Sequence, residues 1–449
     1  MRLLTKKDIR IVFCDISKAF DRVWHAGIIH KLRQLGITGN LLALFQDYLN
    51  NRQQRVLIKG QHSEWGLIKA GVPQGSVLGP LLFLVYINDL ASVVDCEIKL
   101  FADDTLLYVI NDDKDHAANL LNSNLRNVQQ WADQWLVTFS PQKTKLMNIT
   151  QKKNQQWDNF PLHFNNVLLE PVVNHKHLGL NLNVKLKWAD HIDNVIESVS
   201  KMLHVLQKLK YSLDRKTLET IYLTFVRPKL EYACIIWDDC SIDDKERLES
   251  MQLNFARVVT GAKRGTSHEL LYKEISWQPL SERRSNSKMK FMHKIVNKTG
   301  PDYLNNLIPE KVGDCSNYGL RDKGNFKQIK TRTEKYRKSI IPDCVRQWNK
   351  LEDCIKSNTD YLSFVNLLKV KIQPNPLFYG VKRKLAIILN SHLHKLRVVP
   401  NPFCMCDNQT IEDIYHFFFK CNQRNSFLHN VRLLCDKPIN VLIDIIWRQ

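Results

Sequence analysis

The chain has 449 residues, 44% of them hydrophobic, and a formal net charge of +20 at pH 7. This length allows two or three domains with buried cores, and the surplus of Lys and Arg favours a polyanionic partner. The 11 cysteines are scattered, and Met1 to Arg10 is charged without an apolar core. We therefore expect reduced thiols, no signal peptide and an intracellular protein, in the cytoplasm, the nucleus or both.

The first segments alternate strands and helices. Residues 8–16 are apolar up to Asp15, which predicts a buried strand with a carboxylate at its carboxyl end. Apolar residues at helical spacing predict helices over 27–35 and 41–49, and short apolar runs predict strands over 55–58 and 65–68.

A loop rich in Gly and Pro, Gly71 to Pro80, precedes an apolar run that predicts a buried helix. The uncharged stretch from Ala70 to Asn88 is long enough for a membrane span, but its Gly, Pro, Gln and Ser residues interrupt the first half. We therefore expect a buried helix and no membrane-spanning segment.

Two adjacent acids, Asp103 and Asp104, lie between the apolar runs 98–101 and 105–108. These runs predict the two strands of a hairpin with the acids at its turn. Asp is common in ordinary turns, and that interpretation would suffice for this segment alone. Neighbouring carboxylates repel each other, however, so a divalent cation is a natural occupant.

Helical spacing continues beyond the hairpin. Apolar residues from Leu121 to Trp135 predict an amphipathic helix that packs on a sheet. Three further stripes predict helices after residue 185: Ile192 to Leu209, Leu218 to Phe225 before Pro228, and Leu248 to Val258 before Gly261. Weaker patterns predict helices over 288–296 and 361–371.

Strand-end acid, glycine loop and aromatic-x-Asp-Asp hairpin, in this order, resemble the polymerase domain of reverse transcriptases, most closely those of jockey-type non-LTR retrotransposons. The similar segments are Asp15 to Val23, Gly71 to Phe83, Tyr86 to Leu90, Leu100 to Thr105 and His177-Leu178-Gly179. They correspond, in order, to the five polymerase motifs of that family, over residues 9–183. His177 to Gly179 resembles the turn that grips the primer.

The resemblance implies an α+β fold. It comprises a polymerase palm of the ferredoxin-like split βαβ kind over residues 1–185, a helical thumb over 186–262, a basic helical connector over 263–400 and a zinc-knuckle-like region over 401–449. The chain starts fourteen residues before Asp15, so we expect that the fingers and the upstream endonuclease of the family are missing.

The implied activity is RNA-directed DNA polymerisation, in which dNTPs are added to a DNA primer on an RNA template. Two-metal phosphoryl transfer needs carboxylates that hold two Mg²⁺ ions about 3.5–4 Å apart. Asp15 and Asp103 would be direct ligands, and Asp104 a weaker one. Asp21 and Asp89 are expected to be structural.

The resemblance also implies substrate contacts. Phe20 would lie under the incoming sugar and exclude a ribose 2′-hydroxyl, although an ordinary core Phe fits the sequence too. Gln74 and Gly75 would lie near the nucleotide and the template base. Lys143 or Lys145 would protonate or pair with the leaving pyrophosphate, and a surface lysine is the alternative.

The C-terminal third adds two features. Residues 311–400 contain 19 Lys and Arg against 7 Asp and Glu, with the densest run from Arg321 to Lys338, which suggests nucleic-acid contact or a solvated face. Cys404, Cys406, His416 and Cys421 could hold one structural Zn²⁺, against the alternative of buried thiols and a core histidine.

Three interpretations compete: an active reverse transcriptase, a catalytically inactive retroelement remnant that binds nucleic acid, and an RNA-templated RNA polymerase. Phe20, and Phe101-Ala102 in place of a Gly before the two acids, disfavour the third.

Overall fold

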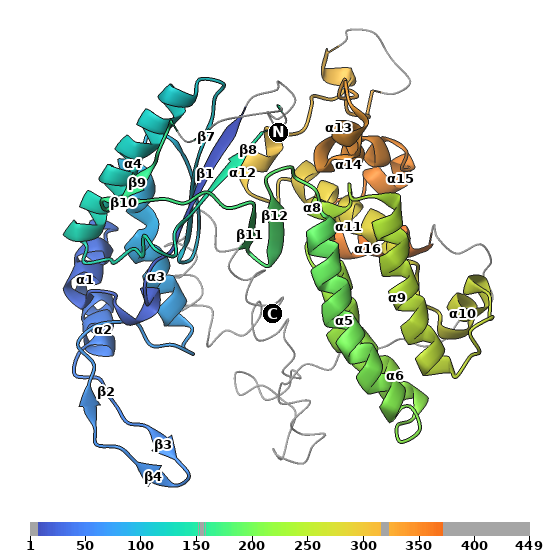
Figure 1. Ribbon diagram of the computed structural model, residues 1–449, viewed down its shortest axis with the longest axis horizontal. Coiled ribbons are helices and arrows are strands. Elements are labelled where there is room, and N and C mark those ends of the chain that lie inside the picture. Colours follow the sequence, from blue (N-terminus) through green and yellow to red (C-terminus); the bar gives the residue numbers. More distant parts are fainter. Residues whose placement is uncertain (1–7, 151, 153–156, 158, 316–322, 371–449) are drawn as a thin grey trace. The chain divides into compact units, whose positions relative to one another are not determined.

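The computed structural model describes residues 8–150, 152, 157, 159–315 and 323–370. It divides into two compact units, Met1–Leu280 and Ser281–Gln449, which we treat separately (Figure 1). Cys404, Cys406, His416 and Cys421 lie outside the described residues, as does the start of the basic run at Arg321. Within the part of the chain that the structure describes, we find no helix with the length and apolar character needed to span a membrane.

The first unit is built on a four-stranded antiparallel sheet of β1 (Ile9–Cys14), β6 (Glu97–Phe101), β7 (Asp104–Ile110) and β8 (Lys145–Ile149). The strand order is β6-β7-β1-β8. Strands β1 and β6 therefore run parallel with β7 between them, which is the split βαβ arrangement expected from the sequence. β1 bonds to a neighbour on both sides, consistent with its nearly continuous apolar sequence.

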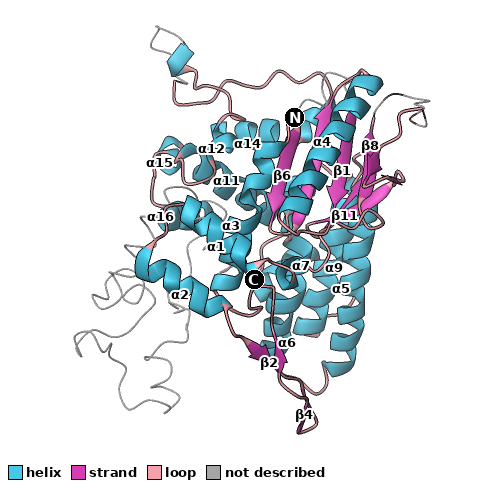
Figure 2. Ribbon diagram, turned by 90° about the vertical axis from the view of Figure 1, so that its left-hand side faces the viewer, coloured by secondary structure: helices cyan, strands magenta, loops and turns pink. Residues whose placement is uncertain are grey.

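Alternate residues of β1 face different cores. Val12 and Cys14 join the helix-covered core, which includes Leu121 and Val128 of α4 (Lys114–Gln134). Figure 2 shows α4 lying along this sheet. Phe13 faces the opposite side, where Met147 and the hairpin of β11 (Asn174–His177) and β12 (Leu180–Asn183) cover the sheet. Successive side chains of a strand point to opposite faces of the sheet, so a strand buried on both faces contributes alternate residues to two cores.

Three helices follow β1 and pack beside the sheet: α1 (His25–Gln34), α2 (Gly39–Leu49) and α3 (Leu78–Ile87). Between α2 and α3 the chain makes an exposed double hairpin of β2 (Gln53–Gln54), β3 (Leu57–Ile58), β4 (Gln61–His62) and β5 (Gly66–Leu67), seen at the lower left of Figure 1. The strands expected over 55–58 and 65–68 are confirmed in place but are shorter, as β3 and β5. A further small hairpin pairs β9 (His163–Phe164) with β10 (Val167–Leu168).

Helices dominate the remainder of the first unit. They are α5 (Ala189–Leu209), α6 (Arg215–Ile221), α7 (Arg227–Glu231), α8 (Cys234–Trp237), α9 (Ile242–Thr260) and α10 (His268–Ile275). Their core is distinct from those of the sheet and contains Ile192, Tyr222, Trp237 and Phe255. The boundary predicted near residue 185 lies inside the compact unit Met1–Leu280 and stays a prediction.

One residue of the predicted stripes is placed wrongly. Phe225 was expected on the buried face, but it is 60% exposed, and Val226 is buried instead. Residues Tyr222–Val226 form a π-helix, whose wider turn adds a residue between inward-facing positions. Pro228, two residues further on, has no amide hydrogen and disfavours a regular α-helix here.

The described part of the second unit is helical. It contains α11 (Leu280–Val296, beginning at the last residue of the first unit), α12 (Asp302–Asn305), α13 (Glu334–Lys338), α14 (Ile340–Asn349), α15 (Asp353–Lys356) and α16 (Tyr361–Val370). Met292, Trp348 and Phe364 share its core. A buried ion pair, Lys288 with Asp343 at 2.6 Å, joins α11 to α14. α11 and α16 confirm the helices expected over 288–296 and 361–371.

A buried lysine joins α1 to the segment after α3. The Lys31 ammonium is 2.6 Å from an Asp89 carboxylate oxygen and also donates to the Tyr86 carbonyl. It lies 3.8 Å from the Trp135 ring centroid, with the Tyr86 and Trp131 rings also within 5.0 Å. Burial lowers the pKa of Lys31, and the pairing with Asp89 opposes this shift. Asp89 therefore has the structural role expected for it.

We predict that Asp89→Ala destabilises the fold by about 1–3 kcal/mol, because it leaves a buried ammonium without its carboxylate. Lys31→Met should cost less, since an apolar chain of similar length fills the aromatic cage without a charge. Urea unfolding at pH 7 measures both. Equal losses, or a larger loss for Lys31→Met, would contradict this account.

Candidate active site

Three carboxylates converge at one end of the sheet because of strand register. In the β1–β7 ladder Cys14 pairs with Thr105, so the next residue of β1, Asp15, lies level with Asp104. In the β6–β7 hairpin Phe101 pairs with Asp104, which leaves Ala102 and Asp103 as a two-residue turn. The expected hairpin is confirmed, with one acid at its tip and one at the start of its second strand.

The turn itself is strained. Ala102 has φ +50°, in the left-handed region that glycine prefers. Two-residue hairpins require positive φ at the first central position, and Gly, Asn or Asp usually occupies it. Alanine here is less favourable, and strained backbone of this kind is concentrated at functional sites.

Asp15 has an unsatisfied oxygen. Its Oδ2 is shielded from solvent and has no hydrogen-bond partner among the described residues, although its side chain as a whole is 42% exposed. The backbone of Asp15 is fixed by two bonds: its carbonyl accepts from the Ser140 amide at 2.8 Å, and its amide donates to the Thr144 hydroxyl at 3.4 Å. A rigidly held carboxylate oxygen without a donor is suited to a cation.

The nearest cationic group to Asp15 is Lys143, whose Nζ lies 3.9 Å from Oδ2. Lys145 instead donates to the Gln142 carbonyl at 3.3 Å and belongs to β8. Between the two lysines that the sequence left open, geometry thus favours Lys143. Its side chain is 71% exposed, so it is free to move toward a substrate.

The electrostatics of Asp104 reflect its neighbours. Partial burial raises the pKa of Asp104, the charges of Asp103 and Asp15 raise it further, and His177 opposes the increase. Burial lowers the pKa of His177, and the Asp104 charge opposes that shift. The charges of His177 and Asp104 therefore influence each other, although no ion pair or hydrogen bond joins these two described residues, and the grip turn stays a prediction. Sequence spacing alone did not relate His177 to Asp104, because the two are 73 positions apart.

These carboxylates suit Mg²⁺, which prefers a few carboxylate oxygens and keeps waters and phosphates as its other ligands. The orphaned Asp15 oxygen and the adjacent Asp103 and Asp104 charges fit such an ion. Within the described residues, however, no three His, Cys, Asp or Glu side chains are already arranged around one point. The three predicted Asp residues are thus close in the fold, but their carboxylates are not arranged as a preformed metal site.

The glycine loop is fixed against the segment after β1. Gly71 has φ +93°, and a Cβ there would lie 2.7 Å from the Asp21 carbonyl oxygen. The Val72 amide donates to the Phe20 carbonyl at 2.8 Å, and the Gln74 side chain donates to the Asp21 carboxylate at 2.7 Å. Asp21 thus positions Gln74, a role that a sequence without structure does not indicate. Gly75 has φ +76° and open space around it.

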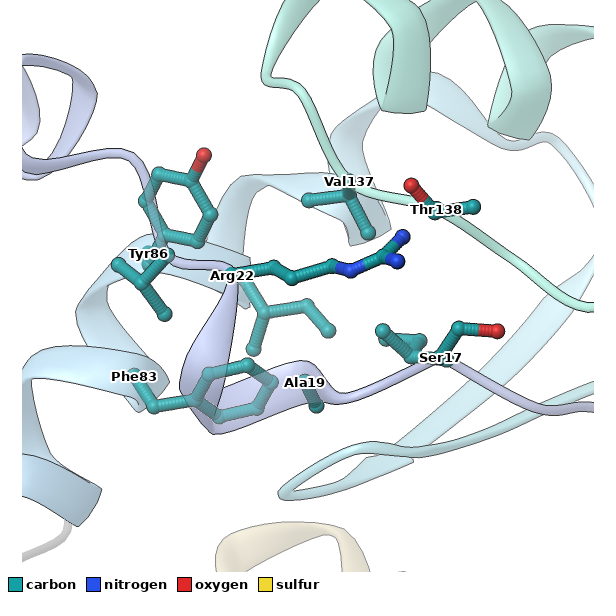
Figure 3. A pocket seen from close by; sticks show the side chains of 10 residues that line it. Ser17, Ala19, Arg22, Phe83, Tyr86, Val137 and Thr138 are labelled. Atoms are coloured by element: carbon teal, nitrogen blue, oxygen red, sulfur yellow. The ribbon is translucent and has the colours of Figure 1, made fainter. Parts of the chain in front are cut away.

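Phe20 is half-buried, and its ring lies 4.7 Å from that of Phe83. Next to Phe83 is a small cavity of about 10 Å³, room for a single water, into which the Arg22 guanidinium points between Ser17 and Thr138 (Figure 3). This cavity is too small for a nucleotide. A nucleotide would have to bind on the open side, where Gln74 and Gly75 are exposed.

Comparison with known proteins agrees with this geometry. Residues 2–182 match the model of the family described as "Reverse transcriptase (RNA-dependent DNA polymerase)". The chain is 27% identical to the "Probable RNA-directed DNA polymerase from transposon BS" of Drosophila melanogaster, over 65% of this chain and 33% of that protein. It is 29% identical to the "RNA-directed DNA polymerase from mobile element jockey" of the same species, over 63% and 32%.

The chain thus spans about a third of the length of these two curated relatives. Among solved structures, telomerase from Candida Tropicalis in complex with a fragment of telomeric RNA overlaps 65% of this chain and 43% of its own, with 11% identity and a TM-score of 0.31. That overlap is too low to support a functional statement.

We predict that Asp104→Asn raises the melting temperature at pH 7 when divalent ions are chelated. The folded-state pKa of Asp104 is raised, so the native state binds the proton more tightly than the unfolded chain does. Wild-type stability from this group is therefore present at low pH and lost as the pH rises through the folded-state pKa. The advantage of the Asn variant should shrink as the pH falls toward about 4. Thermal melts from pH 4 to 8 in EDTA measure it, and a constant difference would contradict the assignment.

Proposed function

We propose that this protein is an RNA-directed DNA polymerase of the non-LTR retrotransposon type, because residues 2–182 match the reverse transcriptase family model. The observation that carries the proposal is the convergence of Asp15, Asp103 and Asp104 at one end of the sheet, with Asp15 Oδ2 shielded and without a hydrogen-bond donor. Adjacent carboxylates repel one another, and the exposed Lys143 ammonium at 3.9 Å is the only ion-pair partner of Asp15 among the described residues, so a bound cation would stabilise the group.

The finer site assignments are part of this proposal. Asp15 and Asp103 would hold Mg²⁺ and Asp104 would support it. The metal, when bound, would activate the primer 3′-hydroxyl and neutralise the leaving pyrophosphate. Lys143, exposed and 3.9 Å from Asp15 Oδ2, would pair with or protonate the pyrophosphate.

Substrates would bind on the open side of these residues. Gln74, oriented by its bond to Asp21, offers a donor and an acceptor to a nucleotide, and the open space at Gly75 allows close approach of a template base. The hairpin turn after His177 would contact the primer end, because the His177 ring packs 5.1 Å from the ring of Phe13, two residues before Asp15. An RNA template, a DNA primer and dNTPs are the proposed partners.

The rest of the chain would support nucleic-acid binding. The sheet unit and helices α5 to α9 would be the palm and thumb, followed by the basic connector and the zinc-knuckle-like region. Lys330 and Arg332 of the basic run are described by the structure, whereas the Zn²⁺ ligand set remains a prediction from sequence spacing. A net charge of +20 suits phosphate contacts.

We predict that Asp103→Ala reduces Mg²⁺-dependent primer extension on an RNA template by about 100-fold or more, because it removes a charge that must stabilise the transition state. Affinity for the primer–template should change little, since the binding charges lie elsewhere. Extension of a labelled DNA primer and fluorescence anisotropy measure the two quantities.

Asp47→Ala is the matched control, because Asp47 is exposed on α2, away from the sheet end. It should extend primers as the wild type does. If the wild type binds primer–template with a steep salt dependence but shows no extension that depends on Asp103, the chain is a binding remnant and the polymerase proposal fails.

A second prediction concerns sugar selection. Phe20→Val should raise the use of rNTPs relative to dNTPs by about tenfold or more, because a smaller side chain leaves room for the 2′-hydroxyl. Single-nucleotide incorporation with matched dNTP and rNTP measures this ratio. Phe139→Leu is the packing control: Phe139 is a buried core residue, so its truncation should lower stability without changing the ratio. An unchanged ratio in Phe20→Val would assign Phe20 to the core alone.

A further inference from the structure

The turn between β11 and β12 has an unusual backbone. Leu178 and Gly179 have φ +45° and +77°, and His177 pairs with Leu180 across them. Positive φ at both central positions is the type I′ pattern, which matches the twist of a hairpin but disfavours a leucine. Leu178 is also 37% exposed. The turn is therefore held in a costly conformation with an apolar side chain near solvent.

A tyrosine from the helical region binds this turn. The Tyr232 hydroxyl donates to the Leu178 carbonyl at 2.9 Å. Its ring lies against Gly179, where a Cβ would be 2.9 Å from Tyr232 Cε1. Gly179 is thus required both for its φ angle and for the approach of the ring. Tyr232 is 54% exposed, so burial alone does not explain its position.

Tyr232 is itself fixed by its neighbours. The Trp237 indole, which is fully buried, donates to the Tyr232 carbonyl at 2.8 Å. Tyr232 is the C-cap of α7, and Ala233, the next residue, has φ +50° and is the N-cap of α8. The chain thus leaves regular helix at Tyr232, where its side chain reaches the turn.

The other end of the same turn adjoins the carboxylates. The His177 ring lies 5.1 Å from that of Phe13, two residues before Asp15, and the charges of His177 and Asp104 influence each other. His175 packs on the same Phe13 ring at 4.1 Å. The turn is thus attached to the sheet through its histidines and to the helices through Tyr232.

We propose that Tyr232 is a positioning residue that fixes the Leu178–Gly179 turn at the distance from the carboxylates at which a primer 3′-end must lie. The inference rests on the proposed polymerase function and deepens it. Tyr232 touches neither the carboxylates nor the nucleotide side of the site, so it acts through the turn alone.

Tyr232→Phe tests the anchor directly, because it removes the hydroxyl and keeps the ring. Hydrogen exchange of residues 174–183 should accelerate about three- to tenfold, while the melting temperature stays near that of the wild type. Tyr211→Phe is the control: Tyr211 is 85% exposed and shows no hydrogen bond of its hydroxyl to a described residue, so neither quantity should change.

The functional arm measures extension kinetics and anisotropy with the same variants. Tyr232→Phe should raise KM for primer–template about three- to tenfold and leave KM for dNTP unchanged. Unaltered exchange and unaltered KM for primer–template would overturn the proposal, as would a parallel loss of stability and of every kinetic parameter. If the wild type extends no primer, the proposed polymerase function fails. Faster hydrogen exchange of residues 174–183 and weaker primer–template binding in Tyr232→Phe would then still support the role of Tyr232 in fixing the turn.

Discussion

The mutual repulsion of three carboxylates at the end of one sheet is the constraint on which the rest of the first unit depends. It follows from the register of β1, which pairs Cys14 with Thr105 and so brings Asp15 level with Asp104. β1 cannot slip to relieve it, because β7 and β8 hold it on both sides and a shift by one residue would exchange its two buried faces. The sheet therefore holds the three carboxylates close together, and a bound cation would reduce their repulsion.

Additional features hold this end of the sheet rigid. The backbone of Asp15 is bonded to Ser140 and Thr144 just before β8. Ala102 adopts a left-handed conformation that it does not favour, at the turn that carries Asp103. Such strain persists only where surrounding contacts determine the geometry. Here the contacts are the ladder hydrogen bonds of β7 with β1 and with β6. These bonds offset the conformational free-energy cost of Ala102.

Sequence reasoning succeeded where one local pattern determined the answer. Apolar runs around Asp103 predicted the hairpin, and helical spacing predicted α4 and α5. It failed where geometry depends on backbone departures that no side-chain pattern encodes. The π-helix turned Phe225 outward, and the ion pair of Lys143 with Asp15 could not be read from the sequence. Contacts between distant segments, such as His175 and His177 with Phe13, appear only when the sheet is assembled.

The loop from Gly71 to Gly79 shows how the site combines rigidity with access. At its start, Gly71 touches the Asp21 backbone, and at its end a Cβ on Gly79 would lie 2.4 Å from the Pro73 carbonyl oxygen. Both ends therefore tolerate no side chain. Gly75, midway, also has positive φ, but nothing lies within 4 Å of where its Cβ would be. Packing explains the outer glycines, whereas the central one leaves room beside Gln74. A loop fixed at both ends with an open middle keeps the Gln74 side chain oriented while leaving it accessible, which agrees with the nucleotide contact proposed for it.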